Sequence, residues 1–276
     1  MNKKLQIRPG TAWSLAIMYA AVVLVRFLLA LLTSAYPTVA IDEFLYYSLG
    51  RSIATEGELL FRGQPADYSF ITYPLVIAPI YWIFQDGAHY FRLIQLWNIL
   101  LMSLSLFPMF GLYKMMLGDE KKAFWLTGVS MLLPDFVLGQ MIFSESIIYP
   151  MFFAMLYCAF RYMRSREGLL PVFIGVLGAL SYFAKPGAVV PAAVFLCFFL
   201  LFGILNKEKK QILFSALGIA ALAAVFVLLQ CLVRYGFHYE SGVLSLYEQQ
   251  IGGGRGLQMG AFLKGLALYP YYLILS

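Results

Sequence analysis

Asp42 and Glu43 are adjacent carboxylates that follow the first long apolar run of the chain. They open the segment 41–50, whose apolar and aromatic residues recur at helical spacing. A helix here would lie at the membrane interface and hold both acids near the lipid headgroups, where ionisable groups are candidates for chemistry. Acids are also favoured in the first turn of any solvated helix. The pair alone therefore supports both interpretations equally.

Four more charged residues stand where a charge needs a partner. Glu145 lies in the short connection between the third and fourth apolar runs, and Lys185 lies in the turn between the fifth and sixth. Lys185 fits snorkelling to lipid phosphate as well as binding of an anionic group. Asp135 and Arg26 fall inside apolar runs, where a charge is costly unless it meets a partner or water. We expect an internal partner for Arg26, whereas Asp135 fits a helix-packing contact as well as a functional site.

The segment 234–260 combines cations, aromatic residues and glycines, and it contains Arg234 and Arg255. Glycines of this kind let a loop approach a phosphate closely. No Gly-Lys-Ser/Thr follows them and no strand precedes them, so this is not a phosphate-binding loop of the known pattern. His89 and His238 are the only histidines. The sequence therefore gives little support to a histidine-rich metal site or a serine-histidine triad.

The elements that must position these residues are transmembrane helices. The 276 residues are 62% hydrophobic and 12% charged, which lies outside the range of soluble domains. Several runs reach the roughly 20 residues that a helix needs to cross the bilayer, and the alternating pattern of a barrel is absent. We predict an all-α, polytopic bundle with about seven to eight spans. The apolar runs lie at 11–33, 92–113, 123–140, 147–163, 169–184, 187–205, 211–233 and from 261 onward.

The distribution of basic residues predicts the orientation of the bundle. Most lysines and arginines fall in segments that are cytoplasmic if the N-terminus is inside. The net charge of +6 is explained in this way and does not indicate a nucleic-acid partner. We predict a multi-pass protein of the plasma (inner) membrane, with a long first outer loop at 34–91. The run 71–84, which contains prolines, is too short to cross and is expected to form an outer re-entrant or juxtamembrane helix.

The ordered set of outer residues resembles the GT-C superfamily of integral-membrane glycosyltransferases, which includes protein O-mannosyltransferases and lipid A aminoarabinose transferases. Glu145 with Pro150, and the turn 184–187 around Lys185, resemble the family's second outer loop and its lysine-containing turn. The resemblance covers roughly residues 11–205. The resemblance also includes Arg26 in the first span, Asp42, Glu43, Tyr46 and Tyr47 in the first outer loop, Tyr73 at the start of the proline-containing apolar segment, and Arg92 at the start of the following span.

The resemblance implies an inverting transfer of a sugar from a polyprenyl-phosphate donor to an acceptor glycan, lipid or protein on the outer face. Asp42 would be the general base, with Glu43 and Glu145 in the same catalytic group. Two acids and a phosphate would suffice for magnesium or manganese, so a divalent cation on Asp42 and Glu145 stays open. The donor phosphate would be bound by Lys185, Arg26, Arg234 and Arg255. The substrate would be lined by Tyr46, Tyr47, Tyr73, Arg92 and Asp135.

Two other classes of function stay open at this stage. A transporter or lipid flippase would use the intramembrane charges Arg26 and Asp135 for translocation. A structural membrane subunit would present a lipid substrate to a partner enzyme. Family members carry more spans and often a soluble C-terminal domain, whereas this chain stops at Ser276 within an apolar run. We therefore expect residues 1–276 to form a single, minimal or truncated catalytic module.

Overall fold

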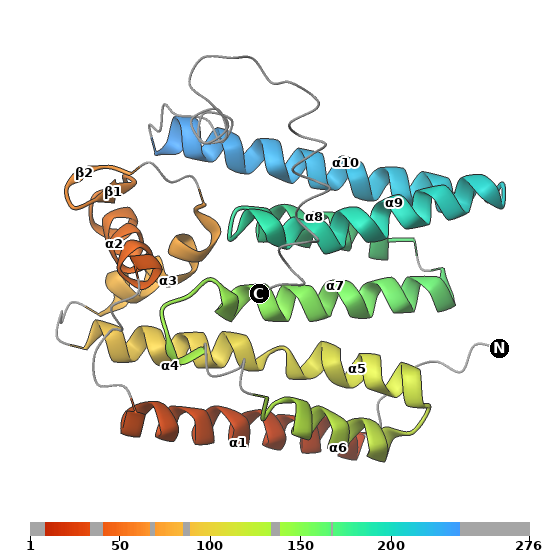
Figure 1. Ribbon diagram of the computed structural model, residues 1–276, viewed down its shortest axis with the longest axis horizontal. Helices are drawn as coiled ribbons and strands as arrows, with labels where there is room; N and C mark the ends of the chain where they lie inside the picture. The colour runs from red at the N-terminus through yellow and green to blue at the C-terminus, as the bar shows by residue number, and fades with distance from the viewer. Residues whose placement is uncertain are drawn as a thin grey trace, which may run out of the picture.

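The computed structural model describes residues 9–33, 41–66, 70–84, 89–133, 139–166 and 168–237. These residues are helical almost throughout, with one short β-hairpin (Figure 1). The all-α prediction is therefore confirmed for the described chain. The helices of the bundle are α1 (Pro9–Thr33), α4 (Tyr90–Ser103), α5 (Leu106–Leu117), α6 (Glu120–Ser130), α7 (Glu145–Ser165), α8 (Leu170–Tyr182), α9 (Val190–Leu205) and α10 (Lys209–Cys231).

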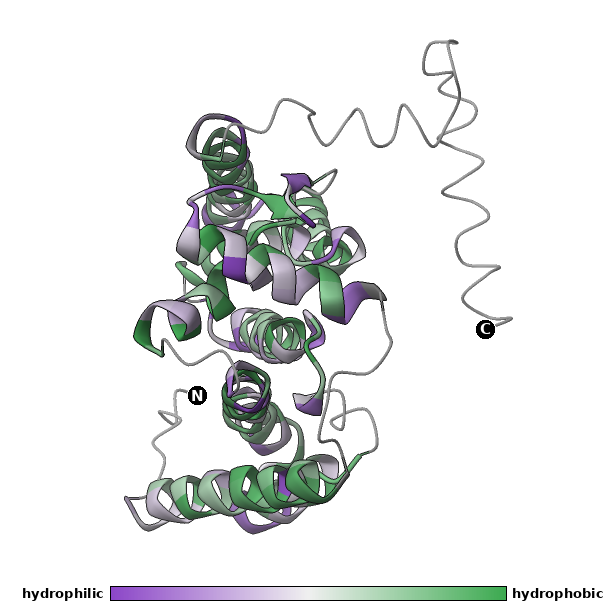
Figure 2. Ribbon diagram, turned by 90° about the vertical axis from the view of Figure 1, so that its left-hand side faces the viewer, coloured by the Kyte–Doolittle hydropathy of each residue, from purple (hydrophilic) through white to green (hydrophobic). Residues whose placement is uncertain are grey.

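Five of the described helical segments are long and apolar enough to cross a membrane, as a multi-pass membrane protein requires. Hydrophobic residues are frequent along the ribbon of these helices (Figure 2), and large apolar side chains are exposed on them, such as Leu32 at the end of α1, which is 83% exposed. Such surfaces are stable against lipid and unstable in water. The segments are Pro9–Leu32, Tyr90–Leu117, Glu145–Ser165, Pro186–Leu205 and Lys209–Gly236.

The helices pack as successive layers. In Figure 1, α1 and α6 form the lowest layer, α4 and α5 follow as one nearly continuous rod, and α7, α8, α9 and α10 lie above them. The approach of α8 and α10 is close because both helices carry glycine at their contact: a Cβ on Gly175 would overlap the carbonyl oxygen of Gly218. Small residues of this kind let helix backbones meet in membrane bundles.

The described residues between α1 and α4 fold into a compact unit at one end of the bundle, on the left in Figure 1. It contains α2 (Ile41–Thr55), a hairpin of β1 (Leu60–Phe61) and β2 (Gln64–Pro65), and α3 (Thr72–Ile83). Both predicted juxtamembrane helices are confirmed as helices. The 12 residues of α3 span only about 18 Å, well short of the bilayer core. The side chains of α2 and of the start of α3 share a buried core with the ends of α8 and α10. Its residues include Leu49, Ile71, Phe183 and Val233.

Two predicted spans are shorter as helices than the sequence indicates. The helix expected at 123–140 is α6, which ends at Ser130, and residues 134–138 lie outside the described chain. Pro134 disfavours helical backbone at the residue before it, and the carbonyl of Met131 accepts a hydrogen bond from Arg26 Nη2 at 2.5 Å. The run 169–184 is α8, whose 13 residues cover about 20 Å.

Candidate functional site

An ion pair between Lys185 and Glu145 lies at the end of the bundle that carries α2 and α3. Lys185 Nζ is 2.6 Å from Glu145 Oε1, and the two side chains are 55% and 22% exposed. Glu145 is the first residue of α7, where the helix dipole favours a carboxylate. The backbone of Lys185 is fixed because its N–H donates to Ser181 O at the end of α8. Lys185 and Glu145, which are 40 positions apart in the chain, are thus in contact, as expected for residues on the same face of the bundle.

Asp42 is the third charged group of this cluster. It lies exposed in the first turn of α2, and its charge reaches Lys185. Partial burial favours a lower pKa for Lys185, but the hydrogen bond and charge of Glu145, together with Tyr46 and Asp42, raise the pKa above its ordinary value. Lys185 is therefore a stable cation that is paired with Glu145 and attracted by the charge of Asp42.

Glu43 differs from its neighbour because it points into the protein. Its side chain is 1% exposed, and Oε1 accepts a hydrogen bond from the backbone N–H of Ile142 at 3.0 Å. A buried carboxylate needs such partners. Glu43 thereby joins the start of α2 to the segment 139–144, which leads directly into Glu145. Its position is that of a residue that places the site, and it is not accessible to a substrate.

Two polar residues of α4 hold the same segment from the other side. Gln95 and Asn98 lie one turn apart on α4, and both are fully buried. Gln95 Nε2 donates to Gln140 O at 2.9 Å, and Asn98 Nδ2 donates to Met141 O at 2.7 Å and to the hydroxyl of Tyr73 at 2.8 Å. The sequence interpretation missed this pair. The signal was present, because buried amides on a transmembrane helix need internal partners.

The tyrosines that were expected to line a substrate lie at two different depths. Tyr46 and Tyr73 are buried, with their rings edge to face at 5.0 Å, and Tyr46 donates to Ser144 Oγ at 3.4 Å. They form the floor beneath the ion pair. Tyr47 is half-buried and lines a hollow on another side of α2, because successive helical residues turn by about 100°.

Arg26 and Arg234, predicted to bind the donor phosphate, and Arg92, predicted to line the substrate, lie in α1, just after α10 and in α4, respectively. Arg26 is buried at 7% exposure and donates to Met131 O and Ser103 Oγ, so the expected internal partner is present. Arg92 donates to Ala30 O and to Gln95 Oε1, which ties α4 to the end of α1. Arg234 is exposed after α10, with its guanidinium over the ring of Tyr235. Arg255 and Asp135 lie outside the described residues.

The described residues do not fit a divalent cation at Asp42 and Glu145. Among them, no three histidine, cysteine or acidic side chains lie close enough together to hold a metal ion. The ammonium of Lys185 also occupies the carboxylate of Glu145, where a cation would have to bind. Stable magnesium and calcium sites draw on several oxygen ligands, and this pair offers few.

No family model, curated protein or solved structure matches the chain. The functional argument therefore rests on the geometry of the cluster formed by Asp42, Glu145 and Lys185.

Proposed function

We propose that the chain is a membrane glycosyltransferase of the GT-C type, which moves a sugar from a polyprenyl-phosphate donor to an acceptor. The observation that supports the proposal is the convergence of Asp42, Glu145 and Lys185 at the α2 end of the bundle. An exposed carboxylate beside a half-exposed cation, at the ends of membrane-crossing helices, suits a substrate with a lipid tail and an anionic head.

Asp42 acts as the general base in this proposal. Its carboxylate takes the proton from the acceptor hydroxyl or amine as that group attacks the anomeric carbon. The bond between the anomeric carbon and the phosphate oxygen breaks, and its electron pair stays on the phosphate. Attack from the face opposite the leaving group inverts the anomeric configuration.

Lys185 stabilises the negative charge that develops on the leaving phosphate. In the free protein its ammonium is held by Glu145 at 2.6 Å. A phosphate at this position competes with Glu145 for the same ammonium, and its arrival leaves the Glu145 carboxylate available to orient the acceptor. Burial of Glu43 and of the tyrosines below keeps this surface in place.

The test is transfer by the purified full chain from a panel of polyprenyl-phosphate sugars, scored by release of free polyprenyl phosphate. Asp42→Asn is expected to lower the rate by about 10²–10⁴-fold. Lys185→Met is expected to lower it by about 10²–10³-fold, the usual effect of removing one electrostatic donor. Both side chains are substantially exposed, so the thermal midpoints should stay near that of the wild type.

A matched control is Asp119→Asn, which removes a carboxylate at the opposite end of the bundle, at the N-cap of α6. It should leave the transfer rate unchanged. Wild-type turnover in Asp42→Asn would refute the assignment of the base. Movement of the donor across proteoliposomes without release of polyprenyl phosphate would instead favour a transporter.

A further inference from the structure

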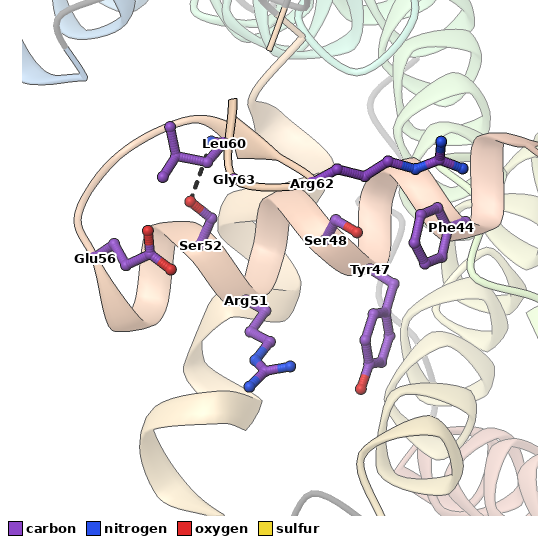
Figure 3. Close-up of a pocket in the computed structure, with 9 residues that line it drawn as sticks. All are labelled: Phe44, Tyr47, Ser48, Arg51, Ser52, Glu56, Leu60, Arg62 and Gly63. Atoms are coloured by element: carbon purple, nitrogen blue, oxygen red, sulfur yellow. Dashed lines mark hydrogen bonds between the residues drawn. The ribbon is translucent and has the colours of Figure 1, made fainter. Parts of the chain in front are cut away.

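A hollow of about 270 Å³ lies on the outward side of α2, beside the β-hairpin (Figure 3). Phe44, Tyr47, Ser48 and Arg51 line it at helical spacing, and Arg62 reaches over it from the hairpin turn. These residues lie on the face of α2 opposite Tyr46, which is buried beneath the ion pair. The hollow is therefore separate from the cluster of Asp42, Glu145 and Lys185.

The two arginines of the hollow carry unneutralised charge. Both are exposed, and neither forms an ion pair with a carboxylate of the described residues. Glu56 also lines the hollow but leaves a net positive lining. Guanidinium groups present several donors in a planar fork that matches a phosphate. The hydroxyls of Ser48 and Tyr47 add donors beside them.

The hairpin turn holds Arg62 in place. Arg62 and Gly63 both have positive φ, at 54° and 75°. Positive φ at both central residues is typical of the type I′ turn that joins the strands of many β-hairpins. Glycine adopts this conformation freely, whereas arginine does so at a cost. The guanidinium of Arg62 then lies over two rings, 5.5 Å from the centre of Phe44 and 5.3 Å from that of Phe61.

The neighbouring end of α3 indicates that the hollow lies at the level of lipid headgroups. Trp82, Ile83 and Phe84 are 61%, 70% and 43% exposed, which suits contact with lipid. Trp82 Nε1 donates to Ala54 O at 2.7 Å, next to Arg51 on α2. Tryptophan with its ring in lipid and its N–H bonded marks the membrane interface. Arg51, one turn before Ala54 on α2, is then at the level of the phosphates, and Arg62 lines the same hollow from the hairpin.

We propose that this hollow binds the phosphate group of an anionic phospholipid from the leaflet in which α2 and α3 lie. Arg51 and Arg62 hold the phosphate, and the side chains of Trp82, Ile83 and Phe84 contact the acyl chains. The site anchors the unit formed by α2, the hairpin and α3 to the bilayer surface. It does not depend on the proposed glycosyl transfer, because none of its residues belongs to the cluster around Lys185.

The test is a titration of the purified full chain, in a neutral detergent, with short-chain phosphatidylglycerol. The double variant Arg51→Gln, Arg62→Gln is expected to raise the Kd by about tenfold or more, since charge-assisted hydrogen bonds to phosphate are lost. The variant Arg51→Lys, Arg62→Lys keeps the positive charges but lacks the planar guanidinium groups. Its Kd should lie between those of the wild type and the glutamine variant. The matched control is Lys209→Gln, Lys210→Gln, which removes two exposed cations at the other end of the bundle and should leave the Kd unchanged.

Inorganic phosphate forms the second arm of the titration, because it shares the ligand chemistry without a lipid tail. Phosphatidylglycerol should bind at least about tenfold more tightly than phosphate, because the acyl chains add apolar contact. Equal affinity for the two would overturn the lipid assignment. An unchanged Kd in the glutamine variant, with an unchanged thermal midpoint, would overturn the site itself.

Discussion

Glu43→Ala tests whether the buried acid of the Asp42–Glu43 pair stabilises the fold. The carboxylate is 1% exposed and accepts the N–H of Ile142 at 3.0 Å. Alanine removes this acceptor and leaves a buried N–H without its partner. A hydrogen bond to a charged group contributes about 1.5–3 kcal/mol. At about 2–4 °C per kcal/mol for a long chain, that lowers the thermal midpoint by roughly 3–12 °C.

The assay is thermal unfolding of the purified full chain in detergent, followed by intrinsic fluorescence. Glu43→Gln keeps an acceptor oxygen for the N–H of Ile142, so its midpoint should lie between those of Glu43→Ala and the wild type. Asp42→Asn is the matched control because the neighbouring acid is exposed. Its midpoint should stay close to the wild type, within the small range usual for surface substitutions.

The two carboxylates should therefore separate cleanly, with Glu43 affecting stability and Asp42 affecting transfer. An unchanged midpoint in Glu43→Ala would refute the reasoning, because the segment 139–144 would then not depend on the buried acid. Loss of transfer in Glu43→Gln at an unchanged midpoint would contradict it as well, since that result would place Glu43 among the reacting groups.

Two further predictions concern other parts of the fold. Gly175→Ala should destabilise the protein by about 1–3 kcal/mol, because its Cβ would overlap Gly218 O; Gly187→Ala, where nothing lies within 4 Å, is the control in the same thermal assay. The backbone N–H groups of Lys122 and Lys121 lower the pKa of Asp119 below its ordinary value of 3.8. Its contribution is therefore present above that ordinary value and is lost as the pH falls through the lower folded value. Asp119→Asn should flatten the acid side of a plot of thermal midpoint against pH, and an unchanged acid side would refute this cause.

The sequence predicted the helical class and the helices α2 and α3 well, because both depend on local properties. Apolar runs of sufficient length must be helical in a bilayer, since unpaired backbone groups are too costly there. The acids of the first turn correctly indicated α2, and the short apolar run with two prolines forms the 12-residue helix α3. The length of α6 was overestimated although Pro134 is a local signal for a helix end. The hydrogen bond from Arg26 to Met131 O, which also lies at this end, comes from another helix and is not visible in the sequence.

The residues of the candidate site were identified from sequence, but their division of labour was not. Asp42, Glu43, Glu145 and Lys185 could be selected as charges at the ends of apolar runs. Which of two adjacent acids is buried depends on the rotation of α2 against α3 and on the approach of the segment 139–144. Sequence alone carries no information on that rotation, because both acids suit a helix start.

The sequence by itself determined that this is a helical membrane protein with its charges concentrated at helix ends, because burial of charge in hydrocarbon is costly at any position. Only the tertiary structure decided that Lys185 pairs with Glu145, that Glu43 supports the segment leading to Glu145, and that Arg51 and Arg62 flank one hollow. These pairings join residues far apart in the chain. They follow from how α2, α4, α7 and α8 pack, which no local pattern specifies.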